Sequence, residues 1–115
     1  MYDDAFKRRL AFDVKFELPD EEMRKLIWGF HLVPDIPLAE ERDLIIKAAA
    51  AASESFSGGD ILKAMRQALP KPIMEQAENP RLAAKHLLEA IEKVRTDNKK
   101  ELTDRQQLGK KLLNA

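Results

Sequence analysis

Residues 57–68 read SGGDILKAMRQA, a stretch typical of a helix whose start is fixed by side chains. Ser57 and Asp60 have the spacing of a capping box, in which each side chain accepts a hydrogen bond from the other residue's backbone N–H. Apolar residues then recur at helical spacing, namely Ile61, Ala64, Met65 and Ala68. The stretch therefore predicts an amphipathic helix that begins after Ser57 and packs one face into a core.

Downstream, the sequence predicts one long helix and a short one. Asn79 and Pro80 are a favoured N-cap and first helical residue, so a helix should run from there to about residue 96. Its buried stripe should consist of Ala84, Leu87, Leu88, Ile91 and Val94. Thr103 and Gln106 form a second capping-box pair, which predicts a separate short helix in the polar tail, residues 97–115.

Two further helices are predicted upstream. One should run from about Leu38 to Ser53, and its shared face should contain Leu44, Ile45, Ala48 and Ala52. The other opens at Asp20, where acidic residues favour a helix start. Its buried stripe should contain Met23, Leu26, Ile27 and Phe30. The aromatic residues Trp28 and Phe30 are both expected in the core.

Residues 11–18 depart from this helical pattern. Phe12, Val14, Phe16 and Leu18 alternate with charged residues, which predicts a half-buried β-strand. No other segment has a strand pattern, so the hydrogen-bonding partners of this strand should lie outside the chain or in a second copy. The predicted fold class is therefore mainly α, a four-helix bundle preceded by one orphaned β-strand.

Composition narrows the classes of protein further. A chain of 115 residues fits one domain, and the absence of Cys excludes disulfides and thiolate metal sites. Lys and Arg total 20 and Asp and Glu total 20, a balance that counts against a dedicated nucleic-acid binder. No apolar run approaches the roughly 18 residues of a membrane helix. The start of the chain is not that of a signal peptide, so the expected location is the cytoplasm.

Motifs for chemistry are missing from the sequence itself. The four glycines form no phosphate-binding loop. His31 and His86 form no metal-binding pattern, so no metal site is expected. We therefore expect no enzymatic activity from this chain alone.

The order of the motifs resembles the C-terminal part of a bacterial AAA ATPase. Phe6-Lys7-Arg8-Arg9 precedes the strand, Ile27-Trp28 lies in the first helix, and the residues 56–61 read FSGGDI. The resemblance covers about residues 4–94. It implies that residues 1–18 are the end of the ATPase core, with its last strand from a parallel sheet, and that residues 19–96 are the helical lid.

The resemblance also implies roles for individual residues. Arg8 and Arg9 match the arginine finger, which acts on the γ-phosphate of ATP bound to a neighbouring subunit; which of the two does so is left open. Gly58 and Gly59 match the turn that packs against the adenine and ribose. Asp60 lies where other branches of the superfamily place a phosphate-sensing arginine, so we interpret it as a helix cap. The alternative is that the arginines are ordinary surface residues and the glycines an ordinary turn.

In such a family the phosphate loop and the Mg²⁺-binding acids lie upstream, so the chain looks like a fragment of a larger ATPase. The intact protein would form a homo-oligomeric ring and couple ATP hydrolysis to the remodelling of a protein partner. The main alternative is a free-standing helical protein-interaction module without a nucleotide role. A nucleic-acid adaptor that uses scattered lysines and arginines is disfavoured by the zero net charge. The apolar strand, residues 11–18, also predicts that the chain self-associates.

Overall fold

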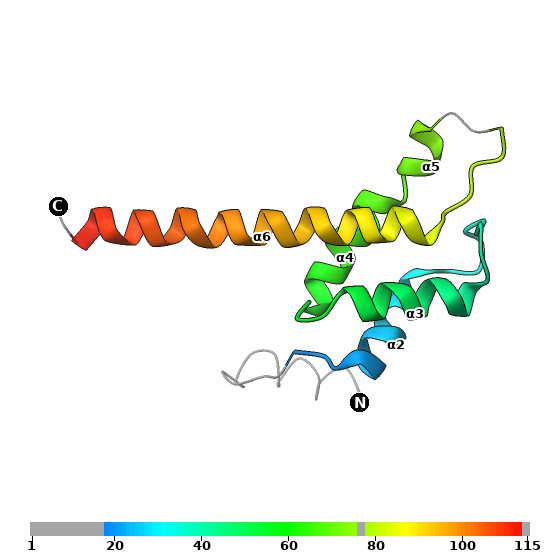
Figure 1. The fold of residues 1–115 in the computed structure, drawn as a ribbon, viewed down its shortest axis with the longest axis horizontal. Helices are drawn as coiled ribbons and strands as arrows, with labels where there is room; N and C mark the ends of the chain where they lie inside the picture. The colour runs from blue at the N-terminus through cyan, green and yellow to red at the C-terminus, as the bar shows by residue number, and fades with distance from the viewer. Residues whose placement is uncertain (1–17, 76–77, 114–115) are drawn as a thin grey trace.

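The computed structural model describes residues 18–75 and 78–113, and this part of the chain is mainly helical. Its elements are α2 (Glu21–His31), α3 (Arg42–Ala52), α4 (Gly58–Ala68), the single turn α5 (Lys71–Met74) and α6 (Ala84–Leu113). Helices α2, α3 and α4 pack with the first half of α6 as a four-helix bundle, and α5 lies at one end (Figure 1). The predicted strand, apart from Leu18, lies outside the described residues, as do Arg8 and Arg9.

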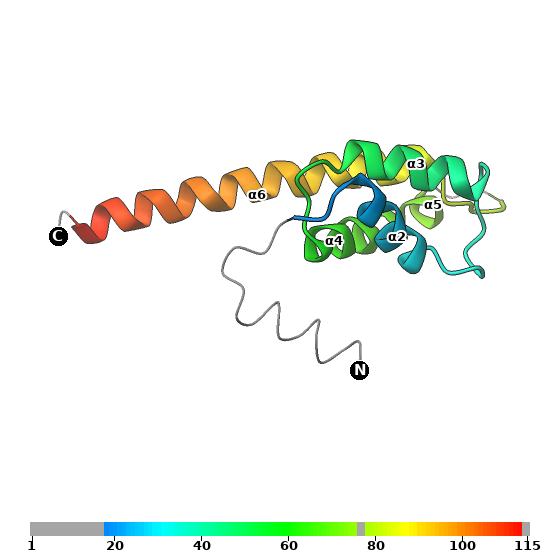
Figure 2. The same ribbon diagram turned by 90° about the horizontal axis from the view of Figure 1, so that it is seen from below.

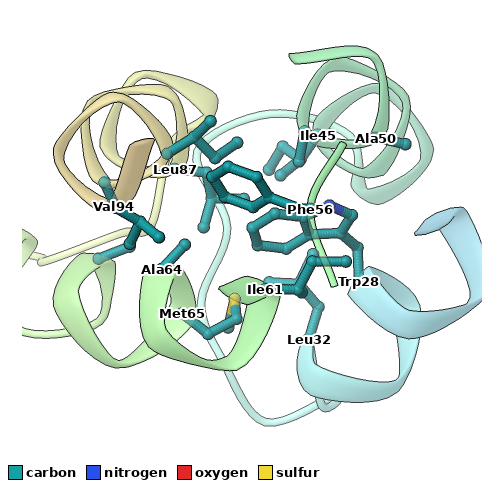
Figure 3. Packing of buried hydrophobic residues seen from close by; sticks show 14 of the residues in the cluster. Trp28, Leu32, Ile45, Ala50, Phe56, Ile61, Ala64, Met65, Leu87 and Val94 are labelled. Atoms are coloured by element: carbon teal, nitrogen blue, oxygen red, sulfur yellow. The ribbon is translucent and has the colours of Figure 1, made fainter. Parts of the chain in front are cut away.

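The core is built from all four long helices. Trp28 of α2 and Phe56, just before α4, lie at its centre, surrounded by aliphatic side chains (Figure 3). The indole N–H of Trp28 donates to the Ser53 hydroxyl at 3.0 Å, so this buried polar group is satisfied. The other large side chains that are fully buried include Leu32, Ile45, Ile61, Met65, Leu87, Ile91 and Val94.

The prediction for α4 is confirmed in its boundary, cap and face. The Ser57 hydroxyl accepts the Asp60 backbone N–H at 3.1 Å, and the Asp60 carboxylate accepts the Ser57 backbone N–H at 3.0 Å. The four residues predicted to face the core are all buried. All of these features depend on residues within one or two turns, which is why a sequence pattern is sufficient to predict them.

Helix α2 starts where predicted but is rotated about its axis. Asp20 is the N-cap, but three of the four residues of the predicted stripe are exposed, namely Met23, Leu26 and Phe30 at 49%, 69% and 79%. The fourth, Ile27, is partly buried and packs against the core as predicted. The buried face instead carries Arg24 and Trp28. Trp28 fills the core, and the Arg24 guanidinium donates to the Ala50 carbonyl at 2.9 Å and to the Pro19 carbonyl at 3.1 Å.

The predicted starts of α3 and α6 are both too early for one reason. Leu38 and Leu82 form a parallel β-bridge, in which the Leu82 N–H donates to the Pro37 carbonyl at 2.8 Å and the Ala39 N–H to the Leu82 carbonyl at 2.9 Å. This pairing holds both segments in extended backbone. Helix α3 therefore begins at Arg42 and α6 at Ala84.

The buried faces of α3 and α6 also differ in part from the predicted ones. In α3 the buried residues are Ile45, Ala49 and Ala50, whereas Leu44 is exposed. In α6 the predicted Leu87, Ile91 and Val94 are buried and Leu88 is partly exposed.

Helix α6 continues without a break through the predicted tail. Thr103 is not an N-cap, because its hydroxyl donates to the Lys99 carbonyl one turn earlier at 3.0 Å. The pair Glu101–Arg105, at 2.8 Å, lies on the same stretch and favours helix. The second half of α6 projects beyond the bundle as a single rod (Figures 1 and 2).

Candidate functional site

The candidate site lies at the exposed start of α4. Gly58 and Gly59 are its first two residues, and no described glycine has a positive φ. A Cβ added at Gly58 would meet nothing within 4 Å, and one at Gly59 would meet only the Ser57 hydroxyl, at an ordinary 3.7 Å. Neither the backbone conformation nor the packing of this fold therefore requires glycine here. The two glycines leave the first turn of the helix open to close approach by another molecule.

Asp60 fixes this turn and connects it to α6. Its carboxylate also accepts a hydrogen bond from the Asn98 side chain at 3.1 Å. Partial burial raises the pKa of Asp60, but the hydrogen bonds from the Ser57 backbone and the Asn98 amide, with the charge of Lys63, outweigh it and leave the pKa below its ordinary value. Asp60 is therefore a charged structural cap, as its sequence context predicts.

An open hollow of about 330 Å³ adjoins Asp60 between α4 and α6. It is lined by Asp60, Lys63, Asn98, Glu101, Leu102 and Arg105. Arg105 is paired with Glu101, so the lining mixes both signs of charge. Phosphate recognition in proteins commonly uses converging cationic donors. The mixed charge of this lining does not provide such a cluster of cationic donors.

The structure brings only part of the predicted site together. Gly58, Gly59 and Asp60 form one turn, as predicted. Arg8 and Arg9 lie outside the described residues. Their proposed role therefore stays a prediction.

Sequence reasoning missed three arginines that hold the ends of neighbouring helices. Arg24 binds the last turn of α3 through Ala50. Arg95 donates to the carbonyls of Ala52 and Glu54, at 2.7 and 3.2 Å, and its guanidinium lies over the Phe56 ring. In the same way the Arg42 guanidinium binds the C-terminal carbonyls of α2. A positive charge is favourable at a helix C-terminus. The sequence contained no signal for these three contacts, because each arginine binds carbonyls that are not its neighbours in the same helix.

Two other features are absent from residues 18–75 and 78–113. No group of three or more His, Asp or Glu residues there could hold a metal ion. No helix of this part is both long and apolar enough to cross a membrane.

Comparison of the sequence with models of known protein families and with curated proteins found no match.

Proposed function

We propose that the chain is the helical lid, with the adjoining end of the core, of an AAA ATPase that couples ATP hydrolysis to the remodelling of a protein partner. The observation that carries this proposal is the open first turn of α4, where Gly58 and Gly59 have no role in the fold itself. The resemblance of residues 56–61 to the nucleotide-contacting turn of that family supplies a reason for both glycines. The four-helix bundle is compatible with a lid.

In this proposal the chain contributes two separate elements to ATP sites. The backbone of Gly58 and Gly59 packs against the adenine and ribose of one ATP. Arg8 or Arg9 acts on the γ-phosphate of an ATP bound to the neighbouring subunit of a homo-oligomeric ring. The phosphate loop and the Mg²⁺ ligands come from outside this chain. The chain alone therefore binds nucleotide weakly and does not hydrolyse it.

The test follows the backbone amides of the glycines. The sequence contains only four, two in the proposed site and two outside it. In a ¹⁵N-labelled chain titrated with ATP, the amides of Gly58 and Gly59 should shift in a saturable way. Gly29 in α2 and Gly109 in the projecting part of α6 are internal controls and should not respond. Equal responses at all four glycines, or none, would contradict the proposal.

A matched pair of variants makes this test specific. Gly59→Val should abolish the shifts, because a branched side chain would occupy the space of the base. Gly109→Val should leave them unchanged, since a Cβ at Gly109 also meets nothing within 4 Å. If both variants respond to ATP like the wild type, these glycines are not part of a nucleotide site.

The second candidate, a helical protein-interaction module, is favoured by a different observation. Met23, Leu26 and Phe30 form an exposed apolar stripe on α2, and exposed apolar patches commonly mark protein-binding surfaces. This candidate predicts that ATP leaves all four glycine amides unshifted. The glycine titration therefore distinguishes the two functions.

A further inference from the structure

His86 in the first turn of α6 is almost fully buried, with 4% of its surface exposed, and both ring nitrogens are engaged. Its Nδ1 accepts the Ala83 backbone N–H at 2.9 Å. Its Nε2 is hydrogen-bonded to the Glu75 carboxylate at the end of α5. A nitrogen that accepts a hydrogen bond carries no proton, so the ring is neutral with its proton on Nε2. His86 thus replaces the usual Glu or Gln of a capping box, at the third position of the helix.

The segment that His86 caps holds other contacts as well. Glu40 accepts the Ala84 N–H at 2.8 Å, so His86 and Glu40 each satisfy one backbone N–H that has no partner within α6. One residue before Ala83, Leu82 makes the β-bridge to Leu38. His86 therefore lies where α5, α6 and the segment before α3 are joined.

Charged groups surround the ring from both helices. From α5 and its C-cap come Lys71 and Glu75, and from α6 come Lys85 and Glu89. Lys71 pairs with Glu89 at 2.9 Å and Lys85 with Glu75 at 3.3 Å. Each pair contains one positive and one negative charge, so together they place no net charge beside the ring. The neutral and protonated forms of His86 therefore differ mainly in the hydrogen bond at Nδ1.

We propose that His86 is a proton-sensitive latch that holds the start of α6 when its ring is neutral and releases Leu82, Ala83 and Ala84 when a proton binds to Nδ1. A protonated Nδ1 is a donor, so it would face the Ala83 N–H with no acceptor between them. The contact of Nε2 with Glu75 survives, because an imidazolium still donates to a carboxylate. The release is therefore confined to the side of α6 that carries the β-bridge to Leu38.

Histidine is the side chain that proteins commonly use as a proton-sensitive group, so a pH titration is the natural test of this latch. This inference does not depend on the nucleotide role, and ATP takes no part in its test. A negative glycine titration would leave it intact.

The test is a pH titration of the full chain by ¹⁵N NMR. At neutral pH the His86 ring should show the Nε2–H tautomer. On acidification the amides of Ala83 and Ala84 should shift along the same curve as the His86 ring. An Nδ1–H tautomer, or amides that do not follow the ring, would overturn the proposal.

Two variants complete the experiment. His86→Gln should keep an acceptor for the Ala83 N–H without titrating, and so should remove the pH-dependent shifts at Ala83 and Ala84. His31→Gln, which changes the other histidine, should retain them. Shifts that persist in His86→Gln would also overturn the proposal. If His86→Gln does not fold, the ring tautomer and the wild-type titration decide the outcome.

Discussion

At the scale of single residues, polar contacts to backbone groups determine how the helices are held together. Arg24 is buried and binds only carbonyl oxygens among the described residues. Asp60 caps its own helix and binds Asn98 across the interface. Hydrogen bonds are directional, so these contacts fix how each helix is rotated and where it ends. Apolar packing alone would define both less well.

We expect Arg24→Met to destabilise the chain by about 2 kcal/mol, because the charged guanidinium's hydrogen bonds to the Ala50 and Pro19 carbonyls are lost. The control is Arg105→Met in the exposed part of α6, which should change stability by less than about 0.5 kcal/mol. Urea denaturation followed by Trp28 fluorescence measures both. Equal effects would contradict the structural role assigned to Arg24.

Asp60 should make stability depend on pH with a defined sign. Its pKa in the folded chain lies below the ordinary value of 3.8, so its carboxylate stabilises the fold above that value and the contribution is lost as the pH falls through the folded-state pKa. At pH 7 Asp60→Asn should cost about 1 kcal/mol through the weakened cap. The difference from wild type should shrink near roughly pH 2, where both side chains are neutral. A difference independent of pH would contradict this role.

At the scale of elements, α4 was predictable and the other helices only in part. The cap and face of α4 depend on neighbours within residues 57–68. The starts of α3 and α6 depend on the bridge between Leu38 and Leu82, which no local pattern contains. The rotation of α2 depends on the contacts of Arg24 and Trp28 with the end of α3.

The same division applies to the candidate site. Its glycines and its capping box are a local motif, so sequence reasoning found them. The hollow beside Asp60 requires Asn98, which is distant in sequence and approaches only because α6 continues past the predicted end of the bundle.

The rotation of α2 can be tested by two substitutions on its opposite faces. Leu26→Gln should change stability by less than about 0.5 kcal/mol, because this side chain is exposed. Trp28→Ala should cost at least about 3 kcal/mol, since it empties the centre of the core. Thermal denaturation followed by circular dichroism measures both. The reverse order of the two effects would restore the orientation predicted from periodicity.

At the scale of the whole molecule, the second half of α6 projects from the four-helix bundle (Figure 2). Apolar side chains are exposed on several elements, among them Met23, Leu26 and Phe30 on α2. The stripe on α2 lies close in sequence to the apolar segment 11–18. Exposed apolar side chains of this kind commonly mark surfaces that bind another protein.

We therefore predict that the chain self-associates through residues 11–18, whose alternating pattern favours pairing with a second copy. Light scattering should give a dimer or a larger species that becomes monomeric in Val14→Lys with its helical signal unchanged. Leu26→Gln, on the α2 stripe, is the control and should leave the association intact. A wild-type chain that remains monomeric at high concentration would contradict this prediction.

The most direct test of the proposed function joins an AAA core, with its phosphate loop and Mg²⁺-binding acids, to the chain upstream of residue 1 and measures ATP turnover. Arginine fingers typically raise the rate of nucleotide hydrolysis about 10³- to 10⁵-fold by acting on the transition state. Replacement of the finger, Arg8 or Arg9, by Ala should therefore reduce turnover by orders of magnitude while ATP binding is retained. Turnover that is unchanged in Arg8→Ala, in Arg9→Ala and in the double variant would contradict the assignment of this chain to an AAA ATPase.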